Sequence, residues 1–181
     1  KELLCVKNIQ KAQLNLIKGK RCRSKYSNIG SINVLTENTA CCWDRSRITE
    51  QTLKYFGLKV RHIHLLHTEN LGYFSHFFRG KDSHAATEVL TSKGWMGVDS
   101  NESFLLIDKN NLPYTFANAI SYGLINNHSK RPFYKSQMIY VIGLYSRNGN
   151  FFEPYIPYIP EINIFDFFSN IFNIKIITPI K

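Results

Sequence analysis

The chain has 181 residues, of which 44% are hydrophobic and 20% charged, a balance that excludes an intrinsically disordered chain and fits one globular domain. No apolar run reaches the roughly 18 residues of a membrane-spanning helix, so we expect no transmembrane segment. The net charge of +10 favours attraction to an anionic surface or polymer. Lys18, Lys20, Arg21, Arg23 and Lys25 form one basic cluster, the other basic residues are scattered, and no nucleic-acid-binding motif accompanies them.

Two helices are predicted in the first third of the chain. Apolar residues recur at helical spacing over residues 2–17, and Gly19 follows as a stop signal. Residues 18–40 are rich in Ser, Asn, Thr and Gly, a composition typical of a long loop. The second helix is expected over residues 41–56. The expected apolar face of the first helix is Leu3, Leu4, Val6, Ile9, Leu14, Leu16 and Ile17. In the second helix, Thr39 is the expected N-cap and Gly57 the expected stop. Its expected core residues are Ile48, Leu53 and Phe56.

Short strands are predicted after the second helix. Residues 58–66 alternate in places between polar and apolar side chains. Residues 84–91 and 94–99 read as two strands of a hairpin around the turn Ser92–Lys93–Gly94, and residues 104–107 as a short fourth strand. The order of helices followed by strands predicts an α+β fold with a mainly antiparallel sheet.

The C-terminal part predicts one more strand and an added segment. Residues 112–127 favour a third helix or an irregular surface segment, and residues 137–145 favour a strand. The Pro-rich residues 154–160 should run extended. Residues 161–173 are spaced as a helix that packs on the body of the protein, or alternatively binds a membrane surface or a partner. We expect a single domain over residues 1–181, with its core at about 30–145 and an extra segment at 146–181.

The four cysteines permit disulfides but do not require them in a chain of this size. Cys41 and Cys42 are adjacent and poorly placed to pair with each other. No CxxC motif is present, and the spacing points to no particular cell compartment.

One cysteine lies where chemistry favours a nucleophile. The segment Thr39-Ala-Cys-Cys-Trp-Asp-Arg-Ser46 places a cysteine at the start of the second predicted helix. There, the helix macrodipole and the free backbone N–H groups stabilise the thiolate and lower its pKa. The thiolate is the nucleophilic form of cysteine, and the same N–H groups can hold an oxyanion.

His84 opens one strand of the predicted hairpin and Asp99 ends the other. If the turn is centred on Lys93, position 102 lies opposite His84, three residues from Asp99. A bulge or strand twist can absorb that offset. We therefore expect both side chains at one end of the hairpin, where the carboxylate would fix the tautomer and orientation of the imidazole.

The order of these segments resembles the transglutaminase-like superfamily. A helix-initiating Cys with Asp two residues later is followed by His84-Ala-Ala-Thr-Glu-Val and by Gly94-Trp-Met-Gly-Val-Asp99. Residues 52–61 resemble the family's helix end, Gly and strand with Arg, and the likeness covers about residues 38–101. The resemblance implies a papain-like core with a catalytic Cys at a helix N-terminus packed on an antiparallel sheet, and it assigns Cys42 as nucleophile, His84 as base and Asp99 as orienting residue.

The function implied by this resemblance is cysteine-dependent acyl transfer on peptide or protein amides through a thioester, with hydrolysis and transamidation both open and no cofactor. The backbone N–H of Cys42 is the expected oxyanion donor, and Asn33 or Asn38 is a candidate second donor. Further candidates for the oxyanion hole or substrate groove are Asn38, Trp43, Tyr73 and Trp95.

Other functions are weighed against this one. The alternative is a catalytically inert transglutaminase-like binding module that holds an anionic partner on a basic surface. A nucleic-acid binder would show steep salt dependence, and we favour it least. His62, His64 and His67 form an H-x-H-x-x-H pattern that zinc would accept. No carboxylate or further Cys lies at a supporting spacing, so we predict no metal.

Overall fold

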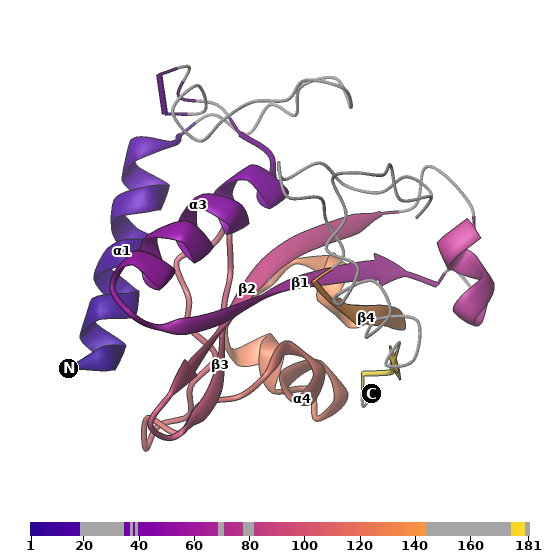
Figure 1. The fold of residues 1–181 in the computed structure, drawn as a ribbon. Helices are drawn as coiled ribbons and strands as arrows, with labels where there is room; N and C mark the ends of the chain where they lie inside the picture. Colours follow the sequence, from indigo (N-terminus) through magenta and orange to yellow (C-terminus); the bar gives the residue numbers. More distant parts are fainter. Residues whose placement is uncertain are drawn as a thin grey trace.

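The computed structural model describes residues 1–18, 35–36, 38, 40–68, 71–77, 82–143 and 175–179. Its elements, labelled as in Figure 1, are α1 (Glu2–Leu16), α3 (Cys42–Tyr55), β1 (Lys59–His67), η1 (Gly72–Phe77), β2 (Ser83–Thr91), β3 (Gly94–Val98), α4 (Phe116–Ser121), η2 (Leu124–Asn127), η3 (Pro132–Lys135), β4 (Met138–Ile142) and β5 (Lys175–Ile177). The predicted Pro-rich stretch and the helix at 161–173 lie outside the described residues, as does most of the loop at 18–40.

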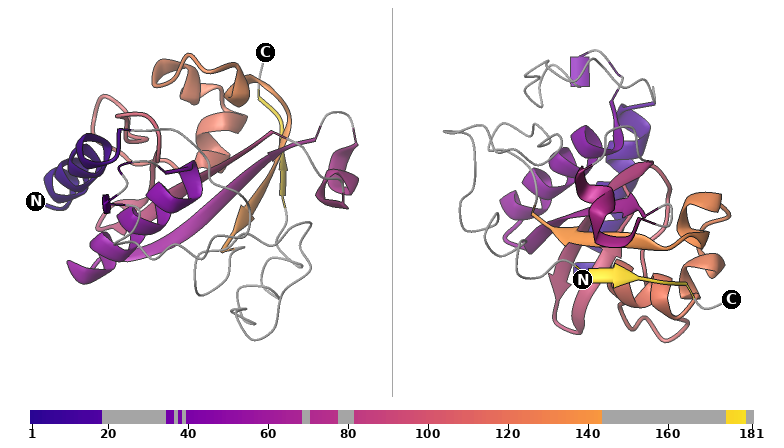
Figure 2. Two further views of the ribbon diagram at one scale, coloured as in Figure 1. Left: turned by 90° about the horizontal axis from the view of Figure 1, so that it is seen from above. Right: turned by 90° about the vertical axis from the view of Figure 1, so that its right-hand side faces the viewer.

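A five-stranded sheet forms the centre of the molecule, in the order β3-β2-β1-β4-β5. Every pair of neighbouring strands is antiparallel. Helix α3 packs across β1 and β2, with α1 against α3. Figures 1 and 2 show α4 and the short helices that follow it on the opposite face of the sheet from α3. The fold is therefore α+β with an antiparallel sheet, as the sequence predicts.

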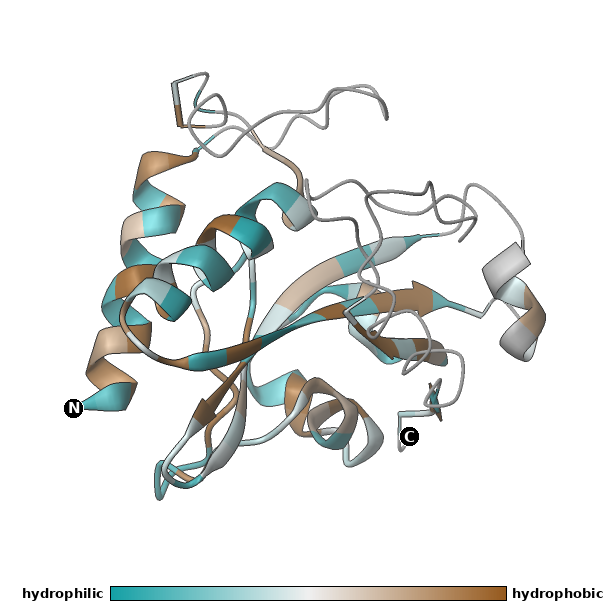
Figure 3. Cartoon of the chain, viewed as in Figure 1, coloured by the Kyte–Doolittle hydropathy of each residue, from teal (hydrophilic) through white to brown (hydrophobic). Residues whose placement is uncertain are grey.

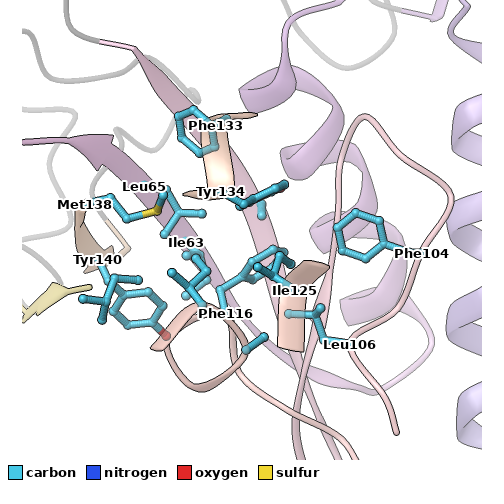
Figure 4. Packing of buried hydrophobic residues seen from close by; sticks show 14 residues of the cluster. Ile63, Leu65, Phe104, Leu106, Phe116, Ile125, Phe133, Tyr134, Met138 and Tyr140 are labelled. Atoms are coloured by element: carbon cyan, nitrogen blue, oxygen red, sulfur yellow. The ribbon is translucent and has the colours of Figure 1, made fainter. Parts of the chain in front are cut away.

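Each face of the sheet has its own hydrophobic core. The core beneath α3 consists of Val6, Leu53, Val89, Met96, Val98 and Leu105. The larger core on the other face, part of which Figure 4 labels, includes Ile63, Leu65, Phe104, Leu106, Phe116, Ile125, Phe133, Tyr134, Met138 and Tyr140. Two cores are possible because alternate residues of a strand point to opposite faces. Figure 3 shows that apolar and polar residues are mixed along these elements.

The hairpin of β2 and β3 has a two-residue turn, Ser92–Lys93, one residue shorter than predicted. Thr91 pairs with Gly94, and the ladder ends where Thr87 pairs with Val98. Continued, this register would place position 101 opposite His84, so the predicted partner at 102 is wrong by one residue. After Val98 the chain leaves the ladder, and the edge of β2 beyond Thr87 is uncovered by β3.

Gly97 permits the close approach of two segments to β3. Its N–H donates to the carbonyl oxygen of Tyr114, and its own carbonyl oxygen accepts the N–H of Leu106, both at 2.8 Å. A Cβ at position 97 would lie 2.5 Å from Leu106 Cδ1 and 2.9 Å from Phe116 Cε2. Only glycine fits here without movement of its neighbours.

Several local predictions need correction. In α1, Leu4 and Leu16 are 63% and 61% exposed, whereas the polar Gln10 and Gln13 are buried. The N-cap of α3 is Cys41 instead of Thr39. Phe56, expected in the core, is 59% exposed. Residues 104–107 form isolated bridges instead of a strand, and β5 was not predicted. The burial of Gln10 is explained by its contacts with residues distant in sequence, since it donates to carbonyl groups of residues 99–104.

Within the described residues, no helix is both long and apolar enough to cross a membrane.

Candidate active site

Cys42 is the first residue of α3 and carries a free, partly exposed thiol. A capping box precedes it: Asp44 accepts the backbone N–H of Cys41 at 3.1 Å, and the Asp44 backbone N–H points to the Cys41 side chain. Cys41 itself is disulfide-bonded. Of the two adjacent cysteines, Cys42 is therefore the one available as a nucleophile.

His84 and Asp99 lie together at the open end of the hairpin. His84 Nε2 is 2.8 Å from Asp99 Oδ2, and both side chains are almost fully buried. The other carboxylate oxygen, Oδ1, accepts the backbone N–H groups of Asn101 and Glu102, each at 2.7 Å. The carboxylate is thus fixed in position by the turn that follows β3, where the sequence predicted a strand end.

Tyr134 is a partner of Asp99 that the sequence analysis missed. Its buried hydroxyl donates a hydrogen bond to Asp99 Oδ2, the oxygen that faces His84. Tyr134 comes from η3, a segment that carries no motif, and a tyrosine in an apolar stretch is more often a core residue. Figure 4 shows it among the core side chains of this face.

Charge and hydrogen bonding define the ionisation of the three groups. Burial alone would raise the pKa of Cys42, but the hydrogen bond and positive charge of His84 and the N–H of Ala85 outweigh it, so the pKa is lowered. Burial alone would lower the pKa of His84, yet the Asp99 charge, its hydrogen bond and the Cys42 interaction raise it to about 9. Against the cost of its own burial, Asp99 has a pKa lowered to about 2, chiefly by His84. Together these shifts favour a thiolate–imidazolium pair at neutral pH.

The end of β3 creates the space for the nucleophile. Past the last paired residues, the carbonyl oxygen of Ala85 accepts the hydroxyl of Ser100 at 2.6 Å instead of a strand partner. The N–H of the same residue interacts with Cys42. In a strand both backbone groups of one residue point to the same side. Cys42 therefore lies against the edge of β2 that β3 leaves open.

Two buried polar residues from the helices hold the turn that carries Asp99. Gln10 of α1 donates to the carbonyl oxygens of Asp99, Glu102 and Phe104, at 2.9, 3.0 and 2.7 Å. Arg45 of α3 donates to Asn101 Oδ1 at 3.1 Å. It also donates to the carbonyl oxygen at the end of α1 at 2.9 Å. Neither residue was predicted, because a single Gln or Arg in a helix carries no signal of a distant partner.

A second group of buried polar residues, separate from those around Asp99, lies beneath α3. Glu50 Oε1 is 2.8 Å from His62 Nδ1 and accepts the hydroxyl of Ser46 at 3.1 Å, and Ser46 Oγ is 2.8 Å from Thr87 Oγ1. Glu50, which is distant in sequence, thus reaches His62 from α3 as a hydrogen-bonding partner. Ser46 has no exposed surface, so no substrate reaches its hydroxyl. The cluster joins α3 to β1 and β2.

The other predicted site residues are scattered relative to the triad. Trp43 follows Cys42 directly and is partly buried. Asn38 has a positive φ of 53°, and its Oδ1 accepts the backbone N–H of Lys18 at 2.8 Å. Trp95 does not join the triad: it pairs with Leu90, six residues or about 20 Å along β2 from His84. Its ring instead lies 4.2 Å below the guanidinium of Arg61. Of the predicted groove residues that remain, Tyr73 lies in η1 and Asn33 in the long loop, and the Tyr73 side chain and all of Asn33 are outside the described residues.

An aromatic wall borders His84 on the side of η3. The ring of Phe133 meets the His84 ring edge to face with centroids 5.8 Å apart. His67 stacks on Phe133 at 4.5 Å, and its Nε2 is 2.7 Å from the carbonyl oxygen of Phe133. Low polarity next to the imidazole strengthens its interactions with Asp99 and Cys42.

The described residues hold no group of three or more His, Cys, Asp or Glu side chains placed to bind a metal ion. His62 and His64 do share the buried face of β1 toward α3, as their spacing predicts, but His62 pairs with Glu50. No protein-family model matches the chain, and no curated protein or solved structure is significantly similar to it. Evidence for its function therefore comes from the arrangement of its own residues.

Proposed function

We propose that this protein is a cysteine-dependent acyl transferase or hydrolase that acts on peptide or protein amides, with the papain-like core of the transglutaminase-like superfamily. The observation that carries the proposal is the meeting of Cys42, His84 and Asp99 from α3, β2 and the turn after β3. Three ionisable groups from separate segments, each with a shifted pKa, are typical of an active site.

The use of the two imidazole nitrogens supports a thiol mechanism. Nε2 of His84 is hydrogen-bonded to Asp99, so Nδ1 is the ring nitrogen that can interact with Cys42. Asp99 has the lower pKa of the pair and stays a carboxylate, so it holds the ring and stabilises the imidazolium without taking its proton.

The proposed reaction proceeds in two steps. Cys42 Sγ attacks the amide carbonyl carbon, and His84 Nδ1–H gives its proton to the departing amine nitrogen as the C–N bond breaks and a thioester forms. Water or a second amine then attacks the thioester, His84 accepts its proton, and the C–S bond breaks. Water yields a carboxylic acid and an amine yields a new amide.

The start of α3 suits the oxyanion of the first step. The capping box uses the N–H groups of Cys41 and Asp44. The backbone N–H of Cys42, in the first turn of α3, has no partner within the helix and no acceptor among the described residues. An N–H at this position points away from the helix, toward a developing negative charge. The backbone N–H of Cys42 is thus the proposed oxyanion donor, and the amide nitrogen of Asn38 remains a candidate for the second.

The test is the rate at which iodoacetamide alkylates Cys42 as a function of pH, in the parent protein and in His84→Ala, with mass spectrometry to locate the label. We expect fast labelling of Cys42 below pH 7 in the parent and its loss in His84→Ala. Cys5 is the internal reference, because its free thiol lies on α1 and its labelling should be the same in both proteins.

A reactive Cys42 would then be offered peptides, with and without a fluorescent amine, and its mass followed for a thioester. Labelling of Cys42 near pH 8.5 only, unchanged by His84→Ala, would contradict the proposal and favour the inert binding module. If Cys42 were reactive but no amide were turned over, the proposed substrate class would be contradicted and the activated Cys42–His84 pair would not.

A further inference from the structure

A second concave site lies away from the triad, between η2, η3 and β5. It is a cavity of about 610 Å³. Both views of Figure 2 place the end of β5 beside the short helices that follow α4. The polar residues that line the cavity are Asn126, Ser129, Lys130, Lys135, Gln137 and Thr178. None of them belongs to the proposed catalytic machinery.

The cavity is electropositive. Among its lining residues in the part of the chain that the structure describes, two are lysines and none is acidic. The sequence has no Asp or Glu between Asp108 and Glu153, so η2 and η3 both lie in a stretch without negative charge. Lys130 and Lys135 form no ion pair with any residue, within the part of the chain that the structure describes. Their ammonium groups are therefore available to an anion.

The two hydroxyl groups of the cavity each accept one hydrogen bond from the protein. Ser129 Oγ accepts the backbone N–H of Arg131 at 3.2 Å. Thr178 Oγ1 accepts from Gln137 Nε2 at 3.0 Å, and Gln137 is held in this orientation because its Oε1 accepts the hydroxyl of Thr68 at 2.9 Å. A hydroxyl oxygen that accepts such a bond keeps its own O–H free to donate. Two hydroxyls and two ammonium groups thus line the cavity as four donor groups.

We propose that this cavity binds a small phosphate-bearing anion. Its volume lies within the range of small-molecule sites. Lysine binds phosphate as a point charge, and neutral hydroxyl donors add hydrogen bonds to the phosphate oxygens. A small ligand fits better than a nucleic-acid strand, because the two lysines line one cavity of limited volume and are not spread along an extended surface.

The test is calorimetric titration of the full chain with inorganic pyrophosphate at low ionic strength. The cavity variant is Lys130→Gln with Lys135→Gln, and the control is Lys93→Gln with Lys109→Gln, which removes the same charge from exposed positions elsewhere. We expect saturable one-to-one binding by the parent, a dissociation constant within about two-fold in the control, and at least about ten-fold weaker binding in the cavity variant. Circular dichroism would establish that both variants are folded.

A second variant tests the hydroxyl donors without any change of charge. Ser129→Ala with Thr178→Val should weaken pyrophosphate binding by a few-fold and leave its stoichiometry unchanged. The proposal is overturned if the parent shows no saturable binding, or if both lysine pairs weaken it equally, since net charge alone would then account for it. Tighter binding of a single-stranded oligonucleotide, equally weakened by both lysine pairs, would also overturn it and favour a nucleic-acid surface.

Discussion

Tyr134 donates a hydrogen bond to Asp99 Oδ2, the same carboxylate oxygen that lies 2.8 Å from His84 Nε2. The acid of the proposed triad thus receives two side-chain donors on one oxygen and two backbone donors on the other. A carboxylate with four donors remains ionised even when fully buried, because hydrogen bonds to the charged form lower its pKa. Tyr134 is therefore a positioning residue for the proposed reaction.

Replacement of Tyr134 tests this role. We expect Tyr134→Phe to lower the free energy of unfolding at pH 7 by about 2 kcal/mol, as for a hydrogen bond to a charged group, and to slow the alkylation of Cys42 at pH 6. Urea unfolding and alkylation rates measure the two effects. Tyr140→Phe is the matched control, since Tyr140 donates to the buried carboxylate of Glu88 at 3.0 Å. Tyr140→Phe should lower the free energy of unfolding and leave the alkylation rate of Cys42 unchanged. If both variants slowed the alkylation equally, a specific role for Tyr134 would be contradicted.

The ion pair of His84 and Asp99 predicts how stability depends on pH. Its measurement needs a Cys42→Ser protein, because the lowered pKa of the thiol titrates in the opposite sense to His84. In the parent protein the pKa of His84 is raised from 6.5 to about 9, and Cys42 supplies part of that rise. In Cys42→Ser the charge and hydrogen bond of Asp99 still raise it, so the contribution of His84 is complete below pH 6.5 and is lost as the pH rises above that value. The pKa of Asp99 is lowered from 3.8 to about 2, so its contribution is present above pH 3.8 and is lost as the pH falls toward 2.

Urea unfolding between pH 2 and pH 10 measures both losses. In the double variant Cys42→Ser with Asp99→Asn, the loss of stability at low pH that is due to Asp99 should disappear. The loss of stability at high pH should become smaller, because Asp99 is the main group that raises the pKa of His84. An alkaline loss of the same size in both proteins would contradict the assignment to this pair.

Gln10 and Gln13 offer a matched pair of buried amides on one helix. Gln10 donates to three carbonyl groups of the Asp99 turn, whereas neither polar atom of Gln13 has a partner among the described residues. We expect Gln10→Leu to lower the free energy of unfolding by about 2 kcal/mol because it strands those buried carbonyls. Gln13→Leu should raise it by about 1 kcal/mol because it removes unsatisfied buried groups. The same sign for both changes, in denaturant unfolding at pH 7, would contradict this difference.

Gly97 is expected to tolerate no side chain. Gly97→Ala should lower the free energy of unfolding by about 1–3 kcal/mol, since its Cβ would meet Leu106 and Phe116 at less than van der Waals distance. Combining it with Leu106→Ala should cost less than the sum of the two single changes, because the smaller side chain makes room. Strict additivity in urea unfolding would show that the clash is relieved elsewhere.

The sequence was sufficient to predict the elements that carry the proposed triad. A cysteine before a helical pattern, and a histidine and an aspartate at the open end of a hairpin, are local signals. The structure places Cys42 at the first residue of α3 and brings His84 to Asp99, although the register is one residue off. Registers are hard to predict from the sequence because turn geometry decides them, and one residue changes the turn.

Only the tertiary structure decided which residues surround the triad. Gln10, Arg45 and Tyr134 come from segments 89, 56 and 35 residues away from their partners in the Asp99 turn. Propensity and periodicity describe neighbours in sequence, and they predicted an apolar face for the first helix that does not include Gln10, although Gln10 is buried. Likewise, Trp95 shares a motif with Asp99 yet lies far along the strand, since each residue of a strand advances the chain by about 3.3 Å. Local patterns therefore determined the helices, the hairpin and the reactive residue types, whereas contacts between distant segments decided what holds the carboxylate, what stabilises the thiolate and where the electropositive cavity forms.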